Sequence, residues 1–206
     1  VTPVNDAPVA DDELGLTTAE DTLLNIDLLT GDTDVDGDTL SVTQINGTAI
    51  AVGGSVAVTT GSVTLLANGT LDFTPAANYN GPASFTYTVS DGAASSTATL
   101  TIGPVSPVND APNAVNDTVA ATEDTAATGN VLANDSDVEG ATLAVTQFVW
   151  NGVTTAAGST ATVAGVGTLV INTNGSFTFT PAANYTGAIS FDYVVTDGTA
   201  TCSVIT

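Results

Sequence analysis

The sequence predicts an all-β protein made of two tandem antiparallel β-sandwich domains. Three observations carry this prediction: a set of motifs that occurs twice, many short segments rich in Val, Ile and Thr, and turn signals between those segments. A repeat of about 100 residues can bury a hydrophobic core of its own, so each copy is expected to be a domain. The expected domains are residues 1–104 and 105–206.

The duplication extends over nearly the whole chain. Pro-Val-Asn-Asp-Ala-Pro at 3–8 recurs at 107–112, an acidic run at 31–38 recurs at 134–141, and Phe-Thr-Pro-Ala-Ala-Asn-Tyr at 73–79 recurs at 179–185. The repeat distance is therefore that of a whole domain and not of a short solenoid turn.

The strand pattern is clearest in the second repeat. Strands are expected at 115–120, 143–149, 167–172, 176–180, 189–196 and 199–205. Asn-Gly at 68–69 and 174–175, and Asp-Gly at 91–92 and 197–198, predict hairpins, and no segment has a convincing helical period. About seven short strands per repeat indicate a sandwich of the immunoglobulin-like or cadherin-like type, with the two domains end to end in a rod.

The composition excludes several functions. The 206 residues include no Lys, Arg or His, and the formal charge is −22. Nothing can neutralise phosphate, so nucleic acid is not an expected partner, and neither an imidazole base nor a lysine nucleophile is available. No apolar run approaches the roughly 20 residues of a membrane-spanning helix, so membrane insertion is not expected. Cys202 is the single cysteine and is expected to be a structural thiol.

The acidic residues fall at repeated positions instead of being scattered. Successive strands of a sandwich run in opposite directions, so alternate loops return to the end where the chain enters the domain. The joint between the repeats is therefore expected to gather side chains from both of them: Glu20, Asp21, Asn109, Asp110, Asp135, Asp137 and Asp197. The corresponding half-sites for neighbouring repeats are Asn5, Asp6, Asp32, Asp34, Asp36 and Asp91 at one end and Glu123, with Asp124, at the other.

Calcium is the cation that this set of residues favours. Ca²⁺ takes about six to eight oxygen ligands, whereas Mg²⁺ keeps more water and Zn²⁺ prefers nitrogen and sulfur. Asp32-x-Asp34-x-Asp36-Gly37 matches the start of an EF-hand loop, but the twelfth position is Thr43 and no flanking helices are expected, so an EF-hand is rejected. The competing interpretation is an Asp-rich turn that caps its own backbone.

Several motifs together carry a family resemblance. Pro-Val-Asn-Asp-Ala-Pro, Glu-Asp-Thr at 20–22 and 123–125, Ala-Asn-Tyr-x-Gly and Ser/Thr-Asp-Gly occur twice and in the same order. The chain resembles the cadherin-like and immunoglobulin-like repeats of large bacterial surface adhesins, including repeat-in-toxin adhesins secreted by type I systems.

The resemblance implies a function and roles for residues. It implies an extracellular extender, in which calcium at the joints stiffens a rod that projects a distal adhesive domain. By position, Glu20, Asn109, Asp110, Asp135, Asp137 and Asp197 match the calcium ligands of cadherin ectodomains. The expected partners are neighbouring repeats of the same chain, and the isolated fragment is expected to be a monomer.

Two other functions were weighed. Catalysis is not expected, because only carboxylates and tyrosines could act and no sugar-binding platform is evident. A carbohydrate- or surface-binding module is the alternative, with Trp150 as a displayed aromatic, although Trp150 is also interpretable as a strand-end residue that packs on the sandwich. Tyr79 and Tyr185 are expected to fix a corner between strands.

Overall fold

A computed structural model describes residues 4–205 of the chain. The chain divides into two compact units, Val1–Val108 and Asn109–Thr206, called unit 1 and unit 2 below. The boundary expected after residue 104 lies inside a strand, Ser95–Val105, which continues through Pro104 because Gly81 pairs with Val105.

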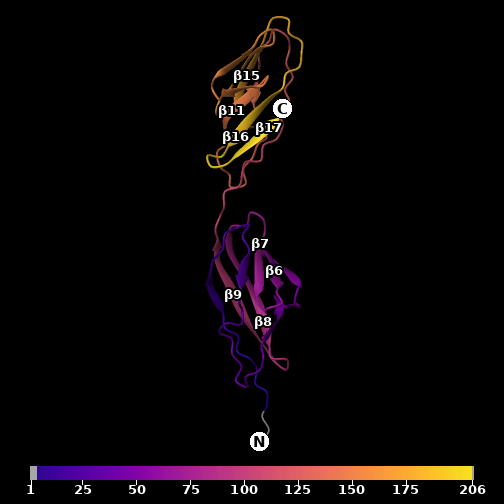
Figure 1. The fold of residues 1–206 in the computed structure, drawn as a ribbon, viewed down its shortest axis with the longest axis vertical. Helices are drawn as coiled ribbons and strands as arrows, with labels where there is room; N and C mark the ends of the chain where they lie inside the picture. The colour runs from indigo at the N-terminus through magenta and orange to yellow at the C-terminus, as the bar shows by residue number, and fades with distance from the viewer. Residues whose placement is uncertain (1–3, 206) are drawn as a thin grey trace. The chain divides into compact units, whose positions relative to one another are not determined.

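The described residues of unit 1 form nine strands in two sheets. Figure 1 labels β6, β7, β8 and β9 among them. The first sheet has the order β1(Glu13–Leu16)-β9(Ser95–Val105)-β8(Gly81–Ser90)-β3(Ser41–Ile45)-β4(Thr48–Ala49). The second has the order β2(Leu24–Ile26)-β7(Leu71–Pro75)-β6(Gly61–Leu65)-β5(Ser55–Val58). All pairs are antiparallel except β1 with β9, which is parallel.

The part of unit 2 that the structure describes forms eight strands in two four-stranded sheets. One has the order β12(Val153–Ala156)-β11(Ala144–Trp150)-β16(Phe191–Thr196)-β17(Thr201–Ile205). The other has the order β10(Ala127–Asn130)-β15(Ser176–Pro181)-β14(Gly167–Ile171)-β13(Thr160–Val163). Both units are therefore β-sandwiches, as predicted, and the described residues contain no helix. Accordingly, no described segment is a helix able to span a membrane.

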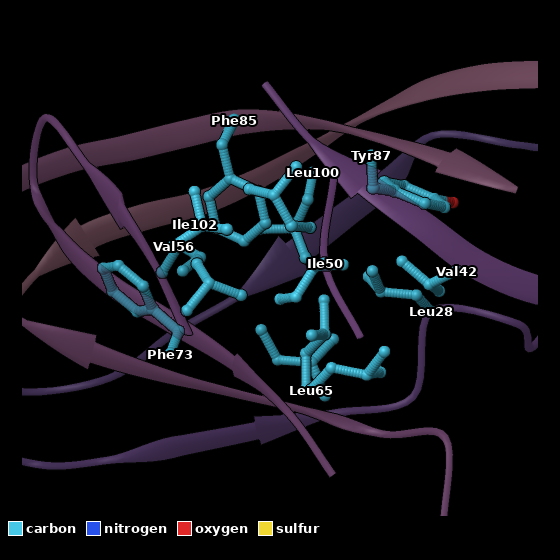
Figure 2. Packing of buried hydrophobic residues seen from close by; sticks show 14 of the residues in the cluster. Leu28, Val42, Ile50, Val56, Leu65, Phe73, Phe85, Tyr87, Leu100 and Ile102 are labelled. Atoms are coloured by element: carbon cyan, nitrogen blue, oxygen red, sulfur yellow. The ribbon is translucent and has the colours of Figure 1, made fainter. Parts of the chain in front are cut away.

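Alternation of side chains explains the strands. Along β8 the side chains of Ala83, Phe85, Tyr87 and Val89 are buried, while the residues between them are more exposed. A strand points successive side chains to opposite faces, so this pattern places one face on a core and the other toward solvent. Inward side chains from both sheets make the core of unit 1, which includes Phe73 of β7 (Figure 2).

The predicted hairpins are present, with longer connections than a two-residue turn. Residues 66–70 join β6 to β7, and the Leu66 amide donates to the Thr70 carbonyl at 2.8 Å. Gly69 in this connection has φ +89°, a conformation that glycine adopts without strain. The predicted tyrosine corners also form: the Tyr79 hydroxyl donates to Pro82 O at 2.6 Å, and Tyr185 to Ala188 O at 3.0 Å.

One strand expected from the sequence is absent. We expected a strand at 115–120, but the structure assigns none there, whereas the corresponding residues of unit 1 form β1. In unit 1, β1 pairs with Leu100 and Ile102 of β9, whereas no described residue of unit 2 pairs with residues 115–120. The structure also contains β10, β12 and β13, which lie outside the strand ranges expected from the sequence.

Candidate metal centre

An acidic loop follows β2 in unit 1. Carboxylate oxygens of Asp34, Asp36 and Asp38 lie within 4.8 Å of one another. The Asp34 Oδ1 atom accepts hydrogen bonds from the amides of Asp36 at 2.8 Å and Asp38 at 3.3 Å. This is the turn-capping role of an Asx side chain. The cap holds the loop in a fixed shape and aims three carboxylates at one volume.

The start of unit 1 meets this loop. The Asp6 amide donates to Asp36 Oδ2 at 2.8 Å, and Asn5 Nδ2 donates to Asp91 Oδ2 at 3.0 Å. Residues separated by 30 and 86 positions are thus joined at one end of the domain. This is the convergence that the alternation of strand direction predicts for the entering segment, the loop after β2 and the loop after β8.

Unit 2 repeats the arrangement. Asn109 Nδ2 donates to Asp197 Oδ2 at 2.8 Å, and the Asp110 amide donates to Glu139 Oε2 at 3.2 Å. Asp137 Oδ1 caps the loop by accepting from the Glu139 amide at 3.1 Å. The recurrence at equivalent positions shows that the geometry belongs to the repeat and not to one irregular loop.

Several carboxylate oxygens in these loops lack a hydrogen-bond donor although they are shielded from water. In the loops these are Asp32 Oδ2, Asp34 Oδ2 and Asp137 Oδ2, and other carboxylate oxygens of this kind are Asp110 Oδ2, Glu13 Oε1 and Glu20 Oε2. A buried ionised oxygen is costly unless it is paired or coordinates a metal. The sequence has no Lys, Arg or His to pair with them. These oxygens therefore fit a cation that brings its own charge.

Hydrogen bonds stabilise the anionic form of Asp91, in the loop after β8, and of Asp197, in the loop after β16. Asp91 Oδ1 accepts from the amides of Ala93 and Ala94, both at 2.6 Å. Hydrogen bonds from the Ala94 amide and then Asn5 lower the pKa of Asp91. The pKa of Asp197 is also lowered, first by the hydrogen bond from the Asn109 side chain and then by bonds from backbone amides. Both aspartates consequently order the entering segment beside its acidic loop.

Asp32 and Asp135 each use one carboxylate oxygen to bind the first segment of their own domain. Asp32 Oδ1 accepts from the Asp11 amide at 2.9 Å, and Asp135 Oδ1 accepts from the Val115 amide at 2.8 Å. The capped turn begins only at Asp34, so the preceding aspartate turns toward the first segment of its own domain.

A second acidic group surrounds a buried tyrosine in each unit. The hydroxyl of Tyr87 donates to Asp11 O at 2.6 Å, and the hydroxyl of Tyr193 donates to Asp117 Oδ2 at 3.0 Å. Burial, followed by the nearby charge of Asp11, raises the pKa of Glu13. Burial also raises the pKa of Asp117, and that of Asp32.

The sequence analysis did not single out this tyrosine-centred group. Asp11, Glu13 and Asp117 lie early in their repeats, outside the acidic loop. An available signal was that Glu13 and Asp117 occupy equivalent positions, each followed by a strand tyrosine, Tyr87 in unit 1 and Tyr193 in unit 2.

Glu20 is the most buried charged residue of the described chain, with 1% of its surface exposed. Its Oε1 atom accepts from the Val108 amide at 2.6 Å, and its own amide donates to Ser106 O at 2.9 Å. Glu20 therefore binds the last residues of unit 1. Asp21 beside it is exposed and has φ +56°.

The sequence counterparts in unit 2 differ from Glu20 and Asp21. Glu123 is exposed, and Asp124 Oδ1 accepts from the Asn184 amide at 2.9 Å. Asp38 was missed as a candidate, and its counterpart in unit 2 is Ala141. Unit 2 thus has one carboxylate fewer in its loop than unit 1.

The aromatic proposed for ligand display is inside the molecule. Trp150 is 4% exposed and packs edge-on against Phe179, with ring centroids 5.9 Å apart. The strand-end interpretation is therefore correct, and Trp150 offers no stacking surface. Cys202 is a free, half-buried thiol in β17.

Family models match both units. Residues 5–103 match the bacterial Ig domain, and residues 109–206 match the bacterial cadherin-like domain. The chain is thus a tandem of immunoglobulin-like and cadherin-like β-sandwich repeats of the bacterial type, as the motifs suggested. Domains of these families are typical of extracellular or surface proteins and are typically non-enzymatic.

Similarity to individual proteins is low. A search of curated proteins gives no significant match. Among solved structures, the endo-fucoidan hydrolase MfFcnA4 of glycoside hydrolase family 107 is 21% identical, with a TM-score of 0.37. The match covers 100% of this chain but only 29% of the hydrolase.

Two other matches are multidomain proteins. Extracellular domains 3–5 of Drosophila OTK are 11% identical, with coverage of 94% of this chain and 57% of that one and a TM-score of 0.36. The titin domains z1z2, solved in complex with telethonin, are 10% identical, with coverage of 98% and 95% and a TM-score of 0.30.

Proposed function

We propose that this chain is a pair of extender repeats of a bacterial surface adhesin, and that Ca²⁺ binds the acidic loop of each repeat. At the junction, we propose that Glu20 and Asp21 of unit 1 share the ion with Asn109, Asp110, Asp137 and Asp197 of unit 2. The ion then restricts the motion of one repeat against the next.

The observation that carries the proposal is the repeated set of shielded carboxylate oxygens without donors. Asp34 and Asp137 occupy equivalent positions, and in both one oxygen caps the loop while the other has no partner. A structural turn needs only the first oxygen. A set of ligands made only of oxygen atoms suits Ca²⁺ better than Mg²⁺ or Zn²⁺.

Sharing between repeats is supported by the position of Glu20. Its carboxylate holds the Val108 amide, and the next residue is Asn109, which begins the acidic group of unit 2. Glu20 Oε2 is buried without a donor. The Glu20 carboxylate is thus bonded to Val108, and the acidic group of unit 2 begins at the next residue, Asn109. We propose that a cation relieves the repulsion between these carboxylates.

An extender role is supported by the burial of the aromatic side chains and by the families of the two units. In both units aromatic side chains pack into the hydrophobic core, including Trp150, Phe73 and Phe148. The families are typical of surface proteins, and this chain carries two such domains in tandem. A module of this kind acts by spacing and stiffness, and cation binding at the junction controls the stiffness.

The test is calcium titration calorimetry on the two-domain chain and two matched variants. Glu20→Gln removes one charge at the proposed junction, whereas Glu123→Gln removes the same charge from the exposed sequence counterpart. Loss of a charged ligand is expected to weaken the tightest site of Glu20→Gln about tenfold or more, equivalent to about 1.4 kcal/mol. Glu123→Gln should bind as the unaltered chain does.

Small-angle X-ray scattering with calcium and then EGTA tests the mechanical consequence. Calcium should narrow the distribution of molecular dimensions for the unaltered chain and for Glu123→Gln, but not for Glu20→Gln. Equal calcium affinity in all three proteins would confine the ions to single repeats and contradict sharing. Retention of the chain on a glycan array would favour the alternative, a carbohydrate-binding module.

A further inference from the structure

The chain contains five Asn-Gly pairs, which begin at Asn46, Asn68, Asn80, Asn151 and Asn174. The backbone nitrogen that follows an Asn can attack the side-chain carbonyl carbon of that Asn, and glycine, which has no Cβ, leaves the approach open. The attack needs an Asn side chain that can rotate toward the backbone and a backbone nitrogen that can move toward it. The surroundings of each pair therefore decide its reactivity.

In three of the pairs a hydrogen bond holds the Asn side chain away from this geometry. Each Asn Oδ1 atom accepts from a backbone amide, namely that of Thr86 at 2.9 Å for Asn46, Thr70 at 3.2 Å for Asn68 and Ser176 at 3.1 Å for Asn174. Each of these side chains must lose its bond before its carbonyl carbon can face the glycine nitrogen.

In a fourth pair the sheet restrains the attacking nitrogen. Gly81, which follows Asn80, is the first residue of β8 and pairs with Val105 of β9. Tyr79 also lies against Gly81, since a Cβ on Gly81 would be 3.2 Å from the tyrosine hydroxyl oxygen. The nitrogen that would attack Asn80 therefore has little freedom to move.

Asn151 and Gly152 have neither restraint. They form the two-residue turn between β11 and β12, with φ of +51° and +76°, and both are exposed. Two consecutive positive φ angles are typical of a type I′ turn, for which Asn-Gly is a favoured pair. Among the described residues, no group bonds the Asn151 side chain or the Gly152 amide.

The longer hairpin of unit 2 explains the difference between Asn151 and Asn46. In unit 1 the turn follows directly after the partner of Tyr87, so Asn46 lies beside Thr86. In unit 2, β11 continues two residues past the partner of Tyr193, to Trp150. The turn therefore lies beyond the position at which the adjacent strand binds the Asn side chain in unit 1.

We propose that Asn151 is a site of spontaneous modification, which the folded chain converts to aspartate and isoaspartate faster than any other Asn-Gly pair. The Gly152 nitrogen attacks Cγ of Asn151 and closes a succinimide ring, and the side-chain nitrogen leaves as ammonia with the proton that Gly152 gives up. One water molecule then opens the ring at either carbonyl. One opening gives aspartate, and the other gives isoaspartate, in which the main chain runs through Cγ.

The product changes the edge of one sheet. In the described part of unit 2, β12 is an edge strand whose ladder partner is β11. Isoaspartate adds one main-chain carbon to the turn, and the turn sets the register of a hairpin. The product also adds a negative charge to a chain that already carries −22. Modification should therefore loosen β12 while the rest of unit 2 stays folded.

The test incubates the two-domain chain in warm neutral buffer with EGTA, folded in one sample and unfolded by guanidinium chloride in another. Pepsin digestion in acid and mass spectrometry give the rate of conversion for each pair, and electron-transfer fragmentation separates aspartate from isoaspartate. Only local sequence matters in the unfolded chain. The ratio of the folded to the unfolded rate therefore reports the effect of the fold at each pair.

This ratio should be highest at Asn151. At Asn46 it should be about five- to tenfold lower, since a hydrogen bond of about 1.0–1.4 kcal/mol must be lost first. Asn151→Gly should remove most of the modification of the folded chain, because a Gly-Gly turn keeps the type I′ conformation but has no side-chain amide. The matched Asn46→Gly variant should leave the modification almost unchanged. Hydrogen exchange of β12 should become faster in the aged chain but not in aged Asn151→Gly.

Equal ratios at Asn46 and Asn151, or a higher ratio at Asn80, would overturn the proposal. An Asn151 that stays intact while the unfolded chain converts would also overturn it, because the turn itself would then protect the side chain. A product that contains aspartate without isoaspartate would exclude the succinimide path, since direct hydrolysis of the amide gives aspartate alone.

Discussion

Replacing Asp34 by Asn separates the capping role of this residue from its proposed role as a calcium ligand. Asp34 Oδ1 accepts from the amides of Asp36 and Asp38, and an Asn side chain offers the same acceptor. Asp34 Oδ2, which is buried without a donor, becomes an amide group. The turn is kept, while one charge and one anionic ligand are lost.

Relative to the unaltered protein, Asp34→Asn should stabilise unit 1 in the absence of calcium and destabilise it in the presence of calcium. At 4.8 Å two carboxylates repel by about 0.9 kcal/mol in a water-like dielectric, and the loop loses two such pairs. Calcium-free Asp34→Asn should therefore be as stable as the unaltered unit 1 or up to about 2 kcal/mol more stable, less at physiological salt. Calcium at 100 times its Kd stabilises one site by about 2.7 kcal/mol, or about 10–20 °C in such a domain, and the variant should lose most of this gain.

Differential scanning calorimetry of the two-domain chain in EGTA and in calcium measures both effects. Asp72→Asn is the matched control, since it removes one charge from β7, where Asp72 accepts from Asn25 at 2.7 Å. Its response to calcium should be unchanged. The reasoning is refuted if Asp34→Asn destabilises unit 1 equally in both conditions, or if its midpoint still rises in calcium as the unaltered protein does.

Three further predictions concern stability without calcium. Tyr79→Phe should destabilise unit 1 by about 1 kcal/mol in urea titrations, because the hydroxyl loses its bond to Pro82 O, and no change would deny the corner a structural role. Phe73→Ala should cost about 3–5 kcal/mol by the same measurement, since the ring is fully buried, whereas a loss under 1 kcal/mol would contradict tight packing.

The raised pKa of Glu13 means that folded unit 1 binds more protons than the unfolded chain, so its stability falls as pH rises from about 4 through the raised value. The lowered pKa of Asp91 acts oppositely, with stability lost as pH falls below its unfolded value. Urea midpoints between pH 3 and 7 in EGTA should therefore peak in mild acid. Glu13→Gln should flatten the descending limb, and an unchanged limb would exclude Glu13 as its cause.

The sequence by itself determined the domain class and the end of each domain where the acids gather. Alternating Val, Ile and Thr require two-faced strands, and the alternation of strand direction brings Asn5 to Asp91 and Asn109 to Asp197. Both contacts follow from the order in which the strands are connected, and the sequence repeat places the same residue types at these positions in both domains. The capping of the loop by Asp34 was also readable, because Asx turns are local.

Only the tertiary structure decided how individual carboxylates are oriented. Asp32 and Asp34 are two residues apart, yet one bonds the Asp11 amide and the other caps its own loop. Likewise, residues 115–120 have a strand-like composition but form no strand, because a strand is completed by its partner and not by its own side chains. Side-chain direction and strand pairing depend on contacts between distant segments, and these exist only once the sheets have packed.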